Sequence, residues 1–138
     1  MKKVLILFGG NSFEHEISCM SVNFIKDNID NSLFNYELVG IDFDNNWFIV
    51  DKNKAITDGW INEEKKNIEN IIDYLKGFDI VFPMIHGNTG EDGKLQSLFE
   101  LYNIKYVGCD SYSSLICYDK LLTKIIFHKS HILFMMKS

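Results

Sequence analysis

Residues 78–96 read FDIVFPMIHGNTGEDGKLQ, and this stretch decides the fold. Its first part is an apolar run rich in branched and aromatic side chains, which predicts a buried strand over Ile80–Ile85. The strand leads into a loop with three glycines, two acids and a histidine, and a segment of helical period follows from about Leu95 to Tyr102. A buried strand that enters a helix through a short loop is typical of α/β proteins with parallel strands.

The same alternation runs along the whole chain. The other predicted elements are a strand over Val4–Phe8, a helix capped by Asn11 or Ser12 and ending near Asn31, a strand over Tyr36–Phe43, a turn at Asn45-Asn46, a strand over Trp47–Val50, a helix over Glu63–Leu75, a short strand over Lys105–Gly108 and a helix from about Ser113. In the first helix, Ile17, Met20, Phe24 and Ile25 recur at three and four residues, the spacing of a packed face. We therefore expect an α/β, Rossmann-like, mostly parallel sheet with helices on both faces.

Composition restricts the function classes. The chain has 138 residues, 46% hydrophobic and 24% charged, which fits one ordinary globular domain. Its net charge of -5 and scattered basic residues argue against nucleic acid as a partner. No apolar run is long enough to cross a membrane. The three cysteines show no CxxC spacing, so we expect free thiols in a reducing cytoplasm and no cysteine-bound metal.

Unusual residues gather in the loops that follow predicted strands, where α/β sheets bind ligands. The loop Gly9–Glu16 combines two glycines with a helix start, which suits either an anion or a plain turn with a cap, and its acids also complement the helix dipole. His86 and Glu91 need more explanation, because neither a turn nor a cap requires them. The loop Gly108–Ser114, followed by Lys120, reads equally well as a capped helix entry.

Taken together, these loops resemble one family, the D-alanine-D-alanine ligases of peptidoglycan synthesis in the bacterial cell wall. The resemblance is carried by FGGNSFEHEIS (residues 8–18), HGNTGEDGKLQS (86–97) and VGCDSYSSLICYDKLLTK (107–124). It implies a Rossmann-like, pre-ATP-grasp fold for this chain. The pieces GCD and ICYDK also resemble the related D-alanine-D-serine ligases, so the second substrate stays open.

The resemblance implies roles for individual residues. Glu14 matches the glutamate that receives the ammonium group of the first D-alanine, and His86 matches the histidine near its carboxyl group, so these two are the expected catalytic residues. Ser18, Gly87 and Glu91 are expected to complete the substrate-binding site. Lys120 matches a lysine that reaches the phosphates of ATP. ATP and Mg²⁺ serve the full-length family, and no cofactor is expected on this chain alone.

Family members are more than twice as long as this chain. We therefore expect residues 1–125 to be an amino-terminal substrate-binding domain, residues 126–138 to be an atypical, truncated tail, and the ATP-grasp domains to be absent. Such a fragment would bind D-alanine and be inactive by itself, and the family's habit of pairing through this domain implies a homodimer. The alternative is a freestanding α/β binding module, which nucleotide sequence downstream of the last codon would distinguish.

Overall fold

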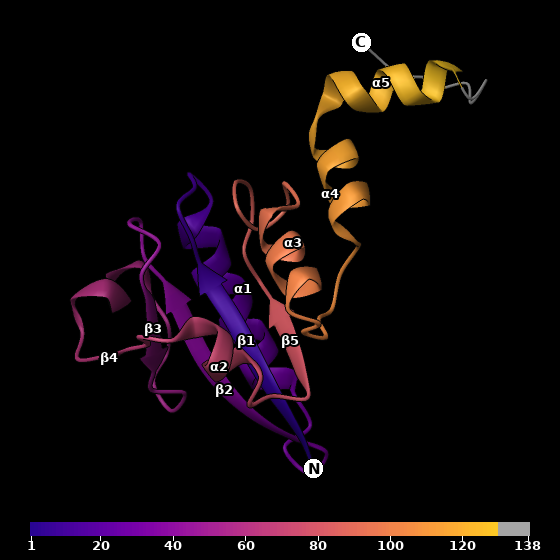
Figure 1. The fold of residues 1–138 in the computed structure, drawn as a ribbon. Helices are drawn as coiled ribbons and strands as arrows, with labels where there is room; N and C mark the ends of the chain where they lie inside the picture. The colour runs from indigo at the N-terminus through magenta and orange to yellow at the C-terminus, as the bar shows by residue number, and fades with distance from the viewer. Residues whose placement is uncertain (130–138) are drawn as a thin grey trace.

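A five-stranded sheet forms the centre of the computed structural model, which describes residues 1–129 (Figure 1). The strand order is β4-β3-β2-β1-β5. β1 (Lys2–Gly9) pairs in parallel with β2 (Phe34–Ile41) on one side and with β5 (Ile80–Pro83) on the other. β3 (Trp47–Val50) and β4 (Lys66–Asn67) continue the sheet beyond β2 as antiparallel strands. The carboxyl ends of β1, β2 and β5 therefore meet at one edge of the sheet.

Helices cover both faces of this sheet, as the sequence predicts. α1 (His15–Asn28) packs on one face, and α2 (Ile71–Leu75) and α3 (Lys94–Leu101) pack on the other. Successive side chains of a strand point to opposite faces, so β1 feeds both cores and is buried on both. Its contribution to the α1 side is Val4, Ile6 and Phe8, and its contribution to the other side is Leu5 and Leu7.

The first helix is rotated relative to the prediction. Ile17, Met20 and Phe24 are 51%, 66% and 67% exposed, so the expectation that they form a packed face is wrong. The face that meets the sheet carries His15, Ser18, Cys19 and Val22 instead. Both rows have helical period. In the buried row Cys19 and Val22 pack in the core, and Ser18 bonds to backbone groups at the ends of β1 and β5. Hydrophobicity alone does not contain that information.

The predicted helix over Glu63–Leu75 is also wrong in its first half. The chain forms a 3₁₀ turn, η1 (Asp58–Asn62), then β4, and only from Ile71 the short helix α2. The Ile68 N–H donates to Trp47 O at 2.9 Å, so the backbone here is used by the sheet. Asn70 starts the helix by accepting the Asp73 N–H at 3.1 Å.

Two further predictions are corrected at the end of the described chain. The strand expected over Lys105–Gly108 is reduced to one parallel bridge between Val81 and Tyr106. The single helix expected from Ser113 is two helices, α4 (Ser111–Tyr118) and α5 (Lys120–Lys129), separated by an extended residue, Asp119.

α4 and α5 lead away from the sheet (Figure 1), and neither contains a buried residue. Glu100 ties the start of α4 to α3, because its carboxylate accepts the Ser111 N–H at 2.8 Å and the Ser111 hydroxyl at 2.6 Å. Of the tail expected over residues 126–138, residues 126–129 continue α5 and the rest lies outside the described residues. Among residues 1–129, no helix has the length and apolar character needed to span a membrane.

Candidate functional site

The loop after β1 turns sharply at two glycines. Gly9 and Gly10 have φ angles of +88° and +90°, a region that side chains strongly disfavour. A Cβ atom on Gly9 would also collide with the carbonyl oxygen of Ile41. The Gly10 N–H donates to that same oxygen at 2.8 Å, which fixes the loop to the end of β2. The turn delivers Glu14 to the start of α1 at the carboxyl edge of the sheet.

Ser12 joins this first loop to the loop after β5. Its hydroxyl donates to His86 O at 2.8 Å and accepts the Glu14 N–H at 3.1 Å. The cap predicted at Asn11 or Ser12 is therefore a link between loops, while Glu14 itself precedes the first helical residue. Residues 74 positions apart in the sequence are thereby held side by side.

Gly87 is the point at which the two loops meet. Its φ is +71°, and a Cβ atom on it would lie 2.8 Å from Glu14 Oε2, so only glycine leaves room for that carboxylate. The Gly87 N–H donates to Glu91 Oε2 at 3.0 Å. Within residues 1–129 the Glu14 carboxylate forms no hydrogen bond or ion pair, so it is available to a cationic ligand.

The His86 ring lies between two partners. Its Nδ1 is 3.6 Å from Glu91 Oε1, and its Nε2 is 3.3 Å from the hydroxyl oxygen of Ser21. The His86 side chain is 30% exposed, so the ring is accessible at one edge. The structure therefore places Glu14, His86, Gly87 and Glu91 in two adjoining loops. Ser21 was not predicted as a site residue, although it lies one helical turn after Ser18 on α1.

Ser18 is placed differently from a substrate ligand. It is 0% exposed, and its hydroxyl accepts the Gly9 N–H at 2.8 Å and donates to Met84 O. These bonds occupy the hydroxyl between the ends of β1 and β5. Ser18 therefore holds the two strands from which the site loops depart, and its oxygen does not face the opening.

His15 is a second residue that sequence reasoning missed. The ring is buried, its Nδ1 lies 2.7 Å from Gly10 O, and the Trp60 Nε1–H donates to its Nε2 at 3.0 Å. Because Nε2 accepts, Nδ1 must carry the proton that is donated to Gly10 O. The ring also stacks on Phe43, with centroids 4.4 Å apart. His15 thus supports the glycine turn, and its only signal in the sequence is its position between Glu14 and Glu16.

Asp92 stabilises the start of α3. Its carboxylate accepts the Lys94 N–H at 3.2 Å and pairs with the Lys94 ammonium at 2.7 Å. Burial raises the pKa of this carboxyl, but the Lys94 side chain and the backbone N–H groups of Thr89 and Lys94 outweigh burial and lower it. Asp92 is therefore a structural anion of the loop.

Lys120 stands apart from the other candidate residues. It is exposed at the first position of α5. Within the described residues, no hydrogen bond or ion pair joins it to Glu14 or His86. Residues 1–129 also contain no group of three His, Cys, Asp or Glu side chains that could hold a metal ion. The described donors therefore do not fit a magnesium site, and a phosphate-binding role rests on Lys120 alone.

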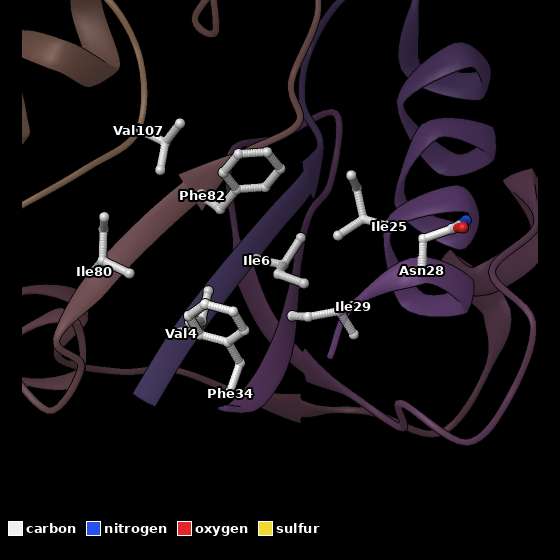
Figure 2. A pocket seen from close by; sticks show the side chains of 9 residues that line it. All are labelled: Val4, Ile6, Ile25, Asn28, Ile29, Phe34, Ile80, Phe82 and Val107. Atoms are coloured by element: carbon white, nitrogen blue, oxygen red, sulfur yellow. The ribbon is translucent and has the colours of Figure 1, made fainter. Parts of the chain in front are cut away.

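A hollow of about 380 Å³ lies between α1 and the strands β1 and β5, away from the carboxyl edge of the sheet (Figure 2). Its lining is Val4, Ile6, Ile25, Asn28, Ile29, Phe34, Ile80, Phe82 and Val107. Asn28 is the single polar residue in this lining, so the hollow offers no charged partner for a zwitterionic amino acid. The polar groups of the candidate site lie beyond it, at the carboxyl ends of the strands.

Comparison with known proteins places these features in a family. Residues 3–109 match the family model described as the D-ala D-ala ligase N-terminus. A D-alanine--D-alanine ligase of Clostridium novyi (strain NT) is 41% identical over 133 residues, which cover 91% of this chain and 38% of that protein. A D-alanine--D-alanine ligase of Thermoanaerobacter sp. (strain X514) is 38% identical over 144 residues, which cover 94% of this chain and 40% of that protein. The chain thus spans about two fifths of the length of these relatives.

Solved structures give the same result. The VanG D-Ala:D-Ser ligase from Enterococcus faecalis superposes with a TM-score of 0.81 at 34% identity, covering 94% of this chain and 42% of that one. The D-alanine-D-alanine ligase from Coxiella burnetii gives a TM-score of 0.79 at 32% identity, with the same coverage. The matched family model includes both the glycine turn after β1 and the loop around His86. This chain therefore belongs to the D-alanine-D-alanine ligase family, in which it corresponds to the amino-terminal domain.

Proposed function

We propose that this chain is the part of an ATP-dependent D-alanine-D-alanine ligase of peptidoglycan synthesis that binds the first D-alanine. The observation that carries the proposal is the meeting of Glu14 and His86 at Gly87, where the Glu14 carboxylate has no hydrogen-bond or ion-pair partner among residues 1–129. Two loops from distant parts of the sequence are held together there by Ser12. Such a site at the carboxyl edge of a parallel sheet is where α/β proteins place their ligands.

The two side chains suit the two ends of an amino acid. The Glu14 carboxylate is complementary to an ammonium group, and a charge-assisted hydrogen bond of this kind contributes roughly 1.5 to 3 kcal/mol. An imidazole that donates to the other end would orient the carboxyl group and offset the charge that develops as it is phosphorylated. Glu91 lies beside the imidazole, with its Oε1 3.6 Å from His86 Nδ1. Gly87 has no side chain and therefore leaves room for the Glu14 carboxylate.

In the complete ligase ATP would supply the phosphoryl group, and Mg²⁺ would neutralise the charge on its phosphates. Lys120 would hold a phosphate as a point charge. We propose that residues 1–138 alone neither hydrolyse ATP nor form a D-alanyl dipeptide, because the described residues offer Lys120 but no cluster of metal ligands. Phosphate release and dipeptide formation with Mg²⁺-ATP and excess D-alanine, beside a full-length ligase, test this; turnover that Glu14→Gln abolishes would contradict it.

D-alanine binding is the direct test of the proposed function. Titration of the ¹⁵N-labelled chain should shift the amide signals of Gly87 and its neighbours, with a dissociation constant of about 1 mM or weaker, equivalent to roughly 4 kcal/mol. Glu14→Gln should abolish the shifts. Glu16→Gln is the matched control, because it removes the same charge from an exposed position two residues away. Equal shifts with L-alanine, or binding that survives Glu14→Gln, would refute the proposal.

The second amino acid is a separate question. The similarity to VanG, a D-Ala:D-Ser ligase, supports D-serine as an alternative second substrate for the complete enzyme. A D-alanine-D-alanine ligase and a D-alanine-D-serine ligase both use D-alanine as the first substrate, so the titration above tests either enzyme. A freestanding α/β binding module would instead show no preference for D-alanine at this edge of the sheet.

We further propose that the chain acts in the cytoplasm as a homodimer. Ile17, Met20 and Phe24 form an exposed apolar row on α1, and Phe13 lies exposed just before the helix. An apolar row of this kind on an otherwise polar helix favours association.

A further inference from the structure

A second serine of α1 is directed at the candidate site. The Ser21 hydroxyl oxygen lies 3.3 Å from His86 Nε2, although the two residues are 65 positions apart in the sequence. Ser18, one turn earlier, bonds to Met84 O, and His86 is two residues beyond Met84. α1 therefore holds the exit of β5 at two successive points, the first through the backbone and the second through the imidazole ring.

The hydrogen-bond inventory decides which atom donates. A serine hydroxyl has one hydrogen, and that of Ser21 goes to Ile17 O at 2.8 Å. The oxygen consequently presents a lone pair to His86 Nε2, so Nε2 must carry a proton and donate it. The same direction of the hydroxyl hydrogen excludes Ser21 as a nucleophile activated by His86, because an activated serine donates to the histidine.

The other ring nitrogen is left for a ligand. Nδ1 is 3.6 Å from Glu91 Oε1, which is longer than a hydrogen bond. It faces the side of the loop where Gly87 bonds to the same Glu91 carboxylate. We propose that Ser21 is a positioning residue, which fixes the ring of His86 with Nε2–H bonded to Ser21, so that Nδ1 points to the substrate side and, when the ring also carries a proton there, its Nδ1–H donates to the carboxyl group of the amino-acid substrate. The substrate part of this inference rests on the proposed function.

Two isosteric variants isolate the hydroxyl group. Ser21→Thr keeps an oxygen at this position, whereas Ser21→Val has the same shape without it. Ser97→Ala is the matched control, because Ser97 on α3 also donates to a carbonyl one turn back, Gly93 O at 2.8 Å, and bonds to no histidine within residues 1–129. Ser21→Ala provides a smaller variant in case branching at Cβ disturbs the helix.

The first measurement needs no ligand. Long-range ¹H–¹⁵N NMR spectra in mildly alkaline buffer, where histidine rings are normally neutral, report which ring nitrogen is protonated. We expect His86 as the Nε2–H tautomer in the unmodified chain, in Ser21→Thr and in Ser97→Ala, and a mixture of tautomers in Ser21→Val and Ser21→Ala. An unchanged Nε2–H tautomer in both variants that lack the hydroxyl would overturn the proposal.

The second measurement is D-alanine titration of the same proteins. Loss of one neutral hydrogen bond that orients the ring should weaken binding roughly 3- to 10-fold in Ser21→Val and Ser21→Ala, and Ser21→Thr should restore it. Unchanged affinity in the Val and Ala variants would overturn the substrate part of the proposal. If the unmodified chain binds no D-alanine while the tautomer still depends on the hydroxyl, the positioning role of Ser21 is supported and the proposed function fails.

Discussion

Ser18→Ala is the substitution that best separates a structural role from a ligand role at this sheet edge. The Ser18 hydroxyl accepts the Gly9 N–H and donates to Met84 O in a fully buried position. Removal of the oxygen takes the serine partner from both backbone groups, of which the Gly9 N–H is buried and the Met84 carbonyl is part-buried. Each buried group that loses its partner costs about 1 to 3 kcal/mol, so with partial relaxation we expect a loss of roughly 2 to 4 kcal/mol in the free energy of unfolding. For a domain stable by about 5 to 15 kcal/mol, this is a large fraction.

Urea denaturation followed by circular dichroism measures this loss. Ser97→Ala is the control, because an exposed serine that bonds only within its own helix should change the free energy of unfolding by less than about 0.5 kcal/mol. A Ser18→Ala variant as stable as the Ser97→Ala variant would refute the strand-holding role. Weaker D-alanine binding at unchanged stability would instead restore the substrate-binding role that the family resemblance implies for Ser18.

Three further outcomes are expected. Burial raises the pKa of the Cys19 thiol to about 12, so a thiol reagent should modify the two exposed cysteines in the native chain and Cys19 only after unfolding; three rapid reactions would contradict this. Phe24→Glu should shift the proposed dimer to a monomer in light scattering. If the unmodified chain is already monomeric at high concentration, the proposed dimer is refuted. Hydrogen bonds from Ser111 and Tyr106 lower the pKa of Glu100 below its ordinary 4.5, so its stabilisation is present above that pH and is lost as the pH falls. Glu100→Gln should therefore flatten the decline of stability in acid, and an unchanged acid profile would contradict this.

The parallel core and the two site loops could be predicted from the sequence because their signals are local. Short branched runs such as Val4–Phe8 identify buried strands. Glycines at Gly9 and Gly87 mark turns that other residues cannot adopt. The right-handed connection of parallel strands then places the following loops at one edge. Glu14 and His86 could be brought together on this basis alone.

The roles of the polar residues on α1 could not be predicted in the same way. Which side of α1 faces the sheet depends on bonds from Ser18 to Gly9 and Met84, and these atoms are distant in sequence. The apolar row at Ile17, Met20 and Phe24 has an equally good helical period and therefore misled the prediction. The short helix α2 shows the same limitation, because backbone pairing with a neighbouring strand overrides helical periodicity.

The geometry of the site is set almost wholly by bonds to backbone atoms. Ser12 bonds to His86 O, Ser18 to Met84 O, and His15 to Gly10 O, so the two loops are held in register without any ligand. Glu14 is the exception, because its carboxylate packs over Gly87 without a described partner. Among residues 1–129 the charge of Glu14 has no partner, so an ammonium group could pair with it without displacing a protein side chain. Residues 1–129 contain no comparable set of donors for phosphoryl transfer, and the role that we propose for this domain is therefore confined to recognition of the first substrate.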